Sequence, residues 1–244
     1  MAKKSFNASV LPRMRAFSGR LIDRGDTVLV GLSGGADSVC LLHFLRYLSR
    51  EKHFALAAVH VNHGLRGKDA LADQRFCKQL CNELAIPFFC EKVNVKKLAK
   101  ELDLSPEHAA RKARYNAFSQ IARAWGATKL ALGHHLDDQA ETFLLNLLRG
   151  TKAKGLAGMP VRRALDKEVE IIRPLLCISR AETEEYVRQN GLSFVTDKTN
   201  TDDVFTRNWV RGTLLPLLET KQPQIRAHLA LLAAEMARLV EKKK

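Results

Sequence analysis

The chain has 244 residues and carries 40 Lys and Arg against 26 Asp and Glu, a net charge of +14. This length suits one large domain with a sizeable core, and 46% hydrophobic residues exclude a disordered chain. No apolar run reaches the roughly 18 residues of a membrane span, and the N-terminal stretch lacks the apolar segment of a secretory signal. The charge favours a polyanionic partner, and nucleic acid is preferred over a membrane surface. A generic solvated basic surface is the alternative.

Basic residues are concentrated in four segments, namely 1–24, 92–123, 152–163 and 221–244, and the remainder carries a small net negative charge. This distribution predicts a phosphate-binding rim around a separate chemical site. The five cysteines are odd in number and include no C-x-x-C pair. We therefore expect no disulfide framework and a reducing, cytoplasmic location.

Strands and helices are expected to alternate along the chain. Apolar, β-branched segments predict strands at 26–33, 54–63, 87–95 and 129–134. Helical spacing predicts helices directly after the first strand, over 68–85, over 105–125 and up to Arg149. The pattern recurs more weakly as a strand at 170–176, a helix at 179–190 and the apolar segment 191–197. The fold class is therefore α/β, with a doubly wound, mainly parallel sheet.

The last 24 residues are expected to form a helix with an apolar stripe at Ile225, Leu229, Leu232, Met236, Leu239 and Val240. We place a boundary near Pro216–Pro223. It separates a catalytic domain over 1–217 from a C-terminal helical extension over 218–244.

A glycine-rich loop joins the first strand to its helix: Ser33, Gly34, Gly35, Ala36, Asp37 and Ser38. Adjacent glycines let backbone N–H groups approach an anion, and a helix N-terminus adds partial positive charge. The loop lacks the lysine of a Walker-type loop and the glycine spacing of a dinucleotide fold. A carboxylate inside a phosphate loop suits a divalent cation, so Asp37 is a candidate Mg²⁺ ligand. The alternative is a tight turn with Asp37 as a helix cap.

Polar residues also follow the second strand. His60, His63 and Arg66 lie at its carboxyl end, where open parallel sheets bind ligands. They can contact phosphate, base or adenine, or they can be hydrogen-bonded loop residues. Zinc is not favoured, because no matching Cys or His pair completes a ligand set.

Two further helices carry candidate charges at helical spacing. Arg111 and Arg114 are three apart and share one face, where they can clamp phosphates or stabilise an adenylated intermediate. Asp138 and Glu141, after Gly-His-His, share one face of the next helix start. They can hold Mg²⁺ or an amine, or act as a general base. The alternative for the arginine pair is a solvated helix face, and the alternative for the acid pair is capping of the helix start.

A final basic pair lies near the C-terminus of the catalytic domain. Arg207 and Arg211 are four apart on one face, next to Asn208, and can reach a phosphate backbone. Asn208 can equally be a buried structural link.

The loop S-G-G-A-D-S resembles that of the N-type ATP pyrophosphatases, which cleave ATP between the α and β phosphates and adenylate an acceptor. Five more blocks narrow the resemblance, in order over residues 26–217: H-V-N-H-G-L-R, A-R-K-A-R-Y, L-G-H-H-L-D-D-Q-A-E-T, R-P-L-L and D-x-T-N with R-N-x-x-R. Together they resemble the tRNA(Ile)-lysidine synthetase family. That family adenylates the C2 oxygen of the wobble cytidine, and free L-lysine then displaces AMP.

The resemblance implies ATP and Mg²⁺ as cofactors and a tRNA(Ile) with a CAU anticodon as partner. It implies ATP binding by residues 33–38 together with His60, and catalytic roles for Asp37, Arg111, Arg114, Asp138 and Glu141. Asp37 and Asp138 are the implied metal ligands. The tRNA would contact His63, Arg66, Arg207, Asn208 and Arg211. Longer members continue into tRNA-binding domains, to which 218–244 would be a linker.

Two alternatives stay open. A tRNA thiolase of the same superfamily would want a catalytic cysteine pair, whereas Cys40, Cys77, Cys81, Cys90 and Cys177 read as small core residues. A non-catalytic basic RNA-binding module would not need acids in both the glycine loop and the helix at 138–141.

Overall fold

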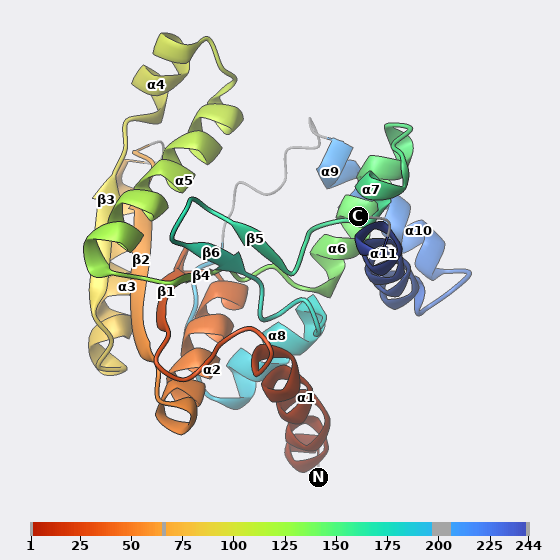
Figure 1. The fold of residues 1–244 in the computed structure, drawn as a ribbon, viewed down its shortest axis with the longest axis horizontal. Helices are drawn as coiled ribbons and strands as arrows, with labels where there is room; N and C mark the ends of the chain where they lie inside the picture. The colour runs from red at the N-terminus through yellow and green to blue at the C-terminus, as the bar shows by residue number, and fades with distance from the viewer. Residues whose placement is uncertain (1, 65–66, 197–205, 243–244) are drawn as a thin grey trace.

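The computed structural model describes residues 2–64, 67–196 and 206–242. Within these ranges, helices cover both faces of a six-stranded sheet (Figure 1). The strands are β1 (Thr27–Gly31), β2 (Ala55–Asn62), β3 (Phe88–Lys92), β4 (Lys129–Ala131), β5 (Arg162–Ala164) and β6 (Glu170–Ile172). The helices are α1 (Ala2–Ser18), α2 (Ala36–Lys52), α3 (Lys68–Glu83), α4 (Val95–Leu102), α5 (Pro106–Trp125), α6 (Leu136–Leu148), α7 (Ala153–Leu156), α8 (Arg180–Gln189), α9 (Thr206–Trp209), the π-helix η1 (Val210–Leu214), α10 (Leu215–Glu219) and α11 (Ile225–Glu241).

The sheet has the order β3-β2-β1-β4-β6-β5, and only the pair of β5 and β6 is antiparallel among the strands described. This confirms the predicted α/β class and the mainly parallel sheet. The edge strand β5 was not predicted, because its three residues Arg162–Ala164 are mostly charged and show no apolar alternation. It is held by pairing with β6, a tertiary contact.

Both faces of the sheet are buried, which explains why β1 reads as a continuous apolar run. Val28 and Val30 pack against α1, α2, α3 and α8, whereas Leu29 packs against α5 on the opposite face. The alternation follows from the twofold period of a strand. Helix α5 begins as predicted, because the Ser105 hydroxyl accepts the backbone N–H of His108 and Pro106 opens the first turn.

The segment 191–197 was expected to repeat the strand pattern, and its described part, 191–196, forms no strand. Instead it crosses the glycine loop, where the Val195 backbone N–H donates to the Gly34 carbonyl over 2.9 Å. Its apolar residues therefore cover the loop and do not extend the sheet.

The C-terminal helices form a small separate core with α6, in which Val210 and Leu215 pack against Leu144. The predicted helix over the last residues is present as α11, but its stripe is partly wrong. Leu232 and Leu239 are 39% and 48% exposed, whereas Ala233 is fully buried. The inward face thus follows a line through Ala233, because a small residue lets α11 approach α6 closely.

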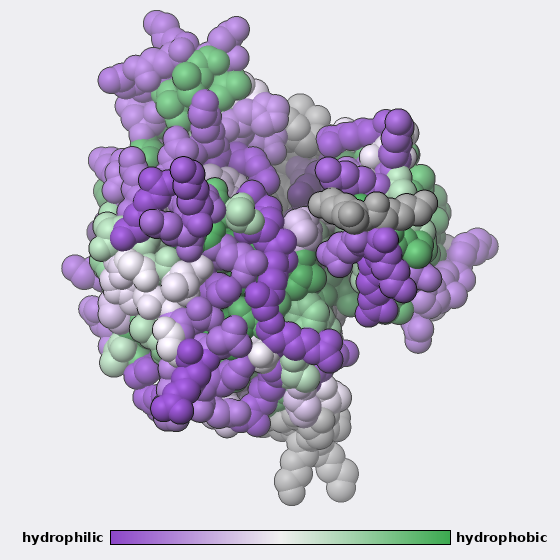
Figure 2. Space-filling model, in the orientation of Figure 1, coloured by the Kyte–Doolittle hydropathy of each residue, from purple (hydrophilic) through white to green (hydrophobic). Residues whose placement is uncertain are grey.

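Hydrophilic residues cover most of the face seen in Figure 2, including the arm formed by α4 and the start of α5. Among the helices described, none is both long and apolar enough to span a bilayer.

Candidate active site

The glycine loop and the start of α6 meet at one edge of the sheet. Strands β1 and β4 are neighbours, and the strand order runs from them in opposite directions. The carboxyl ends of such a pair form the crevice in which open α/β sheets bind ligands. Gly133, after β4, makes the approach possible, since a Cβ there would lie 3.2 Å from the Asp37 carbonyl carbon. A side chain at this position would push α6 away from the loop.

The loop is held in shape by the Ser38 hydroxyl. Its Oγ accepts the backbone N–H groups of Ser33 and Gly34 over 3.2 and 3.1 Å and donates to the Gly35 carbonyl over 2.9 Å. Gly34 has a φ of +94°, which favours glycine. Ser38 is buried, so its hydroxyl stabilises the loop from beneath.

Helix α2 begins without a side-chain cap. Its N-cap residue is Gly35, and among the described residues no side chain caps the N–H groups of the first turn. These donors and the positive end of the helix dipole therefore suit an anion. Asp37 lies in the same turn with a side chain that is 33% exposed. One of its oxygens, Oδ1, accepts the Thr183 hydroxyl of α8 over 2.5 Å.

A cavity of about 660 Å³ opens beside this loop, a size that suits a nucleotide. Its lining includes predicted residues from three regions of the chain: Ser33, Gly35, Asp37, Ser38, His60, His63 and Arg114. It also includes residues that were not among the predicted site residues: Asn62, Asp73, Tyr115, Phe118 and His134. Arg66 lies outside the described residues.

Two histidines of the cavity wall are held neutral. Burial lowers the pKa of His60, whose Nδ1–H donates to the Leu32 carbonyl over 2.9 Å. Burial also lowers the pKa of His134 to about 4, although the Asp138 carboxylate opposes the shift. Both rings are therefore uncharged at neutral pH.

This arrangement predicts a pH dependence of stability. Between about pH 6.5 and pH 4 the unfolded chain binds a proton at His134 that the folded chain does not bind. The free energy of unfolding should therefore decrease as the pH falls through this range. Urea unfolding at about pH 7 and pH 5 measures it. In His134→Asn the decrease should be smaller, and an unchanged decrease would contradict the assignment.

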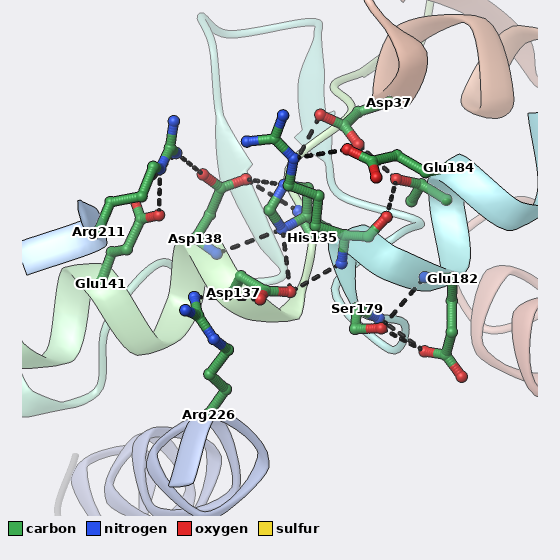
Figure 3. A network of polar contacts seen from close by, with 12 residues as sticks. Asp37, His135, Asp137, Asp138, Glu141, Ser179, Glu182, Glu184, Arg211 and Arg226 are labelled. Atoms are coloured by element: carbon green, nitrogen blue, oxygen red, sulfur yellow. Dashed lines mark hydrogen bonds and ion pairs between the residues drawn. The ribbon is translucent and has the colours of Figure 1, made fainter. Parts of the chain in front are cut away.

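The two predicted acids of α6 face two predicted arginines, Arg207 and Arg211, of which Figure 3 labels Arg211. Glu141 is 1% exposed, and its oxygens accept from Nε of Arg211 over 2.6 Å and from Nε of Arg207 over 2.9 Å. Asp138 Oδ1 lies 3.3 Å from Arg207 Nη2 and 3.4 Å from Arg211 Nη2. Arg207 and Arg211 were predicted to reach a phosphate backbone. In the structure both guanidinium groups contact the acid pair.

His135 links the acid pair to the glycine loop. Its Nδ1 accepts the Asp138 backbone N–H, and its Nε2 lies 3.6 Å from Asp37 Oδ2 and 3.5 Å from Asp138 Oδ2. The two carboxylates thus converge on one atom. Burial tends to raise the pKa of Asp138, but the neighbouring histidines, the His135 backbone N–H and Arg207 outweigh it and lower that pKa. Asp138 is therefore ionised.

Asp137 has a different place from Asp138. Its Oδ2 accepts the backbone N–H of Arg180 at the start of α8 over 2.7 Å, and its Oδ1 lies 3.2 Å from Arg226 Nη1 of α11. It ties α6 to two other helices, as Figure 3 shows. The sequence offered no signal for this, because adjacent acids point to different sides of a helix and their partners are remote in the chain.

We therefore predict that Asp137→Asn acts on stability. The free energy of unfolding should fall by about 1–2 kcal/mol, because a carboxylate at a helix N-terminus and its partly buried ion pair are lost. Urea unfolding measures this loss of stability. In single-turnover assays of the folded protein, the rate of pyrophosphate release from ATP should stay within about threefold of that of the unaltered chain. A rate loss as large as that of Asp138→Asn would contradict the separation of the two acids.

The predicted arginines of α5 surround an aromatic ring. Arg111 Cζ and Arg114 Cζ lie 5.1 and 5.9 Å from the centre of the Tyr115 ring. Arg163 of β5 lies over the same ring at 5.0 Å. Arg114 and Tyr115 line the cavity, so a guanidinium group faces it. Among the described residues, no carboxylate forms an ion pair with Arg114.

The cysteines behave as core residues. Cys40, Cys77 and Cys81 are buried, and all five are free thiols. Burial raises the pKa of Cys77, Cys81 and Cys177 to about 12, so these thiols stay protonated. Among the described residues, no three His, Cys, Asp or Glu side chains are arranged to hold a metal ion by themselves.

Comparisons with known proteins agree with this geometry. The family model described as a PP-loop domain matches residues 9–218, which include both strand ends, the glycine loop and the acid pair. The chain belongs to the PP-loop domain family. We call residues 33–38, which lie within the matched range, the PP-loop.

Curated relatives of the PP-loop chain carry one name. It is 41% identical over 223 residues to a tRNA(Ile)-lysidine synthase of Clostridium perfringens, covering 91% of this chain and 46% of the relative. It is 43% identical over 201 residues to the enzyme of that name from Bacteroides thetaiotaomicron, covering 82% of this chain and 45% of the relative. The chain thus spans less than half the length of these relatives.

Solved structures confirm the fold of the PP-loop domain. The U34-tRNA thiolase NcsA from Methanococcus maripaludis, with its 4Fe-4S cluster, superposes with a TM-score of 0.81 at 22% identity, covering 98% of this chain and 80% of that one. The NH3-dependent NAD synthetase of Campylobacter jejuni superposes with a TM-score of 0.53 at 15% identity, covering 97% and 96%. At these identities the likeness concerns the fold.

Proposed function

We propose that this PP-loop chain catalyses the ATP-dependent ligation of L-lysine to C2 of the wobble cytidine in a tRNA(Ile) with a CAU anticodon. The cytidine O2 attacks the α-phosphorus of ATP, and pyrophosphate leaves. The lysine amine then attacks C2, the C2–O bond breaks, and lysidine and AMP form. The observation that carries the proposal is a cavity lined by Gly35, Asp37 and Ser38 at the uncapped start of α2, with the Asp138 carboxylate next to Asp37 across His135. The name shared by the curated relatives supports it.

Each step has residues suited to it. The first turn of α2 and the loop Ser33–Gly35 suit the triphosphate, and neutral His60 suits the nucleotide. Arg114, with Arg111 nearby, suits the negative charge of the α-phosphate in the adenylated intermediate and on the departing AMP. Asp138 and Glu141 suit the lysine ammonium, although Arg207 and Arg211 compensate their charge in the structure.

Asp37 and Asp138 would also hold Mg²⁺. Their Oδ2 atoms both lie within 3.6 Å of His135 Nε2, and carboxylate oxygens with phosphates are the ligands that Mg²⁺ prefers. When bound there, the ion would neutralise phosphate charge during the departure of pyrophosphate. The remaining ligands would come from the nucleotide and water.

The test measures AMP release and incorporation of labelled lysine into CAU-anticodon tRNA(Ile) in the presence of ATP and Mg²⁺. We expect lysine incorporation to require all components and to fail with a tRNA of another anticodon. Transfer of labelled sulfur without lysine incorporation would instead support a thiolase. RNA binding without any nucleotide turnover would support a non-catalytic module.

A further inference from the structure

Four arginines form a cluster around Tyr115, and two of them come from the β5–β6 hairpin. Arg111, Arg114 and Arg163 place their guanidinium groups 5.0–5.9 Å from the ring centre. Arg173, directly after β6, lies close enough that Arg163 and Arg111 help burial to lower its pKa. We call these residues the arginine cluster. Its charges repel one another, so it needs an anion.

The arginine cluster lacks a protein counter-charge. Among the described residues, none of its four members forms an ion pair with a carboxylate, whereas the neighbouring Arg162 lies 3.3 Å from Glu170. Arg173 is only 3% exposed; its Nη1 donates to the Pro160 carbonyl, but its buried Nε–H has no partner. A buried cation without a counter-ion and with an unsatisfied donor is costly. Both deficits indicate a site for an anionic ligand.

The cluster extends from the surface to the cavity. Arg111 is exposed, Arg163 and Arg114 are half-buried, and Arg173 is buried. Arg114 and Tyr115 line the same cavity as the PP-loop. The exposed Lys152 and Lys154 precede the hairpin in a segment without acids. A ligand bound along the arginine cluster would extend from the cavity to the surface. A polymer can extend in this way, whereas a nucleoside triphosphate held by the PP-loop stays inside the cavity.

We propose that the arginine cluster binds a phosphodiester of the RNA strand beside the target nucleotide. Arg163, which is half-buried at the surface, is the positioning residue that holds the backbone while the base enters the cavity. Enzymes that react with a base must take it out of its stack, and phosphate contacts set the position of the strand. Guanidinium groups suit this role because they bind phosphate oxygens in pairs. The inference rests on the proposed function for the identity of the RNA.

The experiment compares two single-substitution variants of the full chain, with the substitutions at neighbouring positions. Arg163→Gln removes a charge from the arginine cluster, and Arg162→Gln removes the same charge from the other side of the same strand. The probe is a fluorescein-labelled anticodon stem–loop RNA with a CAU anticodon, and its anisotropy is measured over a range of salt concentrations without ATP or lysine. Equilibrium binding of ATP is measured separately.

We expect Arg163→Gln to weaken RNA binding about tenfold and to reduce the slope of log K against log salt by roughly 0.7, the value for one phosphate contact on a single strand. Arg162→Gln should change the affinity by about twofold or less, and ATP binding should be unchanged in both.

Three results would overturn the proposal. Arg163→Gln weakens ATP binding and not RNA binding, which assigns the cluster to the nucleotide phosphates. Arg163→Gln and Arg162→Gln have equal effects on RNA, which indicates a diffuse basic surface. The unaltered chain shows no salt-dependent RNA binding. Because neither ATP nor lysine is present, these outcomes are independent of whether the chain forms lysidine.

Discussion

Replacing Asp37 with asparagine is expected to lower the rate of ATP-dependent AMP release by about a thousandfold or more, the scale of losing a group that stabilises developing charge. The Asp37 carboxylate lies in the first turn of α2, and its Oδ2 converges with Asp138 Oδ2 on His135 Nε2. Asparagine keeps the Oδ1 that accepts the Thr183 hydroxyl but removes the negative charge. Single-turnover measurement of pyrophosphate release tests this.

Stability should change little in Asp37→Asn, because a third of the side chain is exposed and the Thr183 hydrogen bond is retained. We expect the free energy of unfolding to stay within about 1 kcal/mol. Asp26→Asn is the matched control, since Asp26 precedes β1 at the opposite end of the same strand and accepts the Thr128 hydroxyl. Normal activity of Asp37→Asn at saturating Mg²⁺, or an equal loss in the control, would refute the assignment.

Removal of the Arg211 guanidinium, as in Arg211→Met, is expected to lower the free energy of unfolding by about 2–4 kcal/mol. Glu141 is 1% exposed, and Arg211 supplies two of its hydrogen bonds, at 2.6 and 3.1 Å. Without Arg211 a buried carboxylate keeps only Arg207. Burial opposes the charge of Arg211, but Glu141 outweighs it and raises the pKa of Arg211. Arg211 thus stays charged across the usual pH range.

The double variant separates stability from chemistry. Glu141→Gln combined with Arg211→Met should recover at least about 1 kcal/mol relative to Arg211→Met alone, because no buried charge is left unpaired. Lysine incorporation should stay at background in the double variant, because it lacks Glu141, which is proposed to bind the lysine amine. Urea unfolding and labelled-lysine assays provide the two readouts. Additive stability effects would show that the pair is not coupled, and restored activity would remove Glu141 from the reaction.

The periodic elements were predictable from sequence because their signals are local. Strand β1 and helix α5 were predicted within two residues, since a buried apolar run and the Ser105–Pro106 start depend only on neighbouring residues. Helices α1 and α4 were not predicted, because the apolar residues of α1 do not show a clear helical spacing in the sequence and α4 is short. The end of β4 and its Gly133 contact with Asp37 became evident only in three dimensions.

The site was predictable to the extent that its residues lie in contiguous motifs. The loop at 33–38 and the shared face of Asp138 and Glu141 follow from spacing along a turn of helix. Thr183 was not singled out, because its partner Asp37 is far away in the chain. His135 was not singled out either, because its role depends on the start of helix α6. Arg173 opens the R-P-L-L block, but the block by itself indicates no role for this side chain.

By itself the sequence determined the α/β alternation, the anion-binding loop and the presence of an acid pair, because each depends on residues within one element and its turn. Only the tertiary structure decided which charges meet: Arg207 and Arg211 with the acids, Arg226 with Asp137, and the arginine cluster with Tyr115 and with no carboxylate among the described residues. These ion pairs join positions about seventy residues apart or more, as Arg211 and Glu141 do. The spacing of residues in the sequence does not indicate which of such distant positions meet. The net charge indicated a polyanion, and the pairing of β5 with β6 brings Arg163 to the arginine cluster that we propose as a binding site for its phosphates.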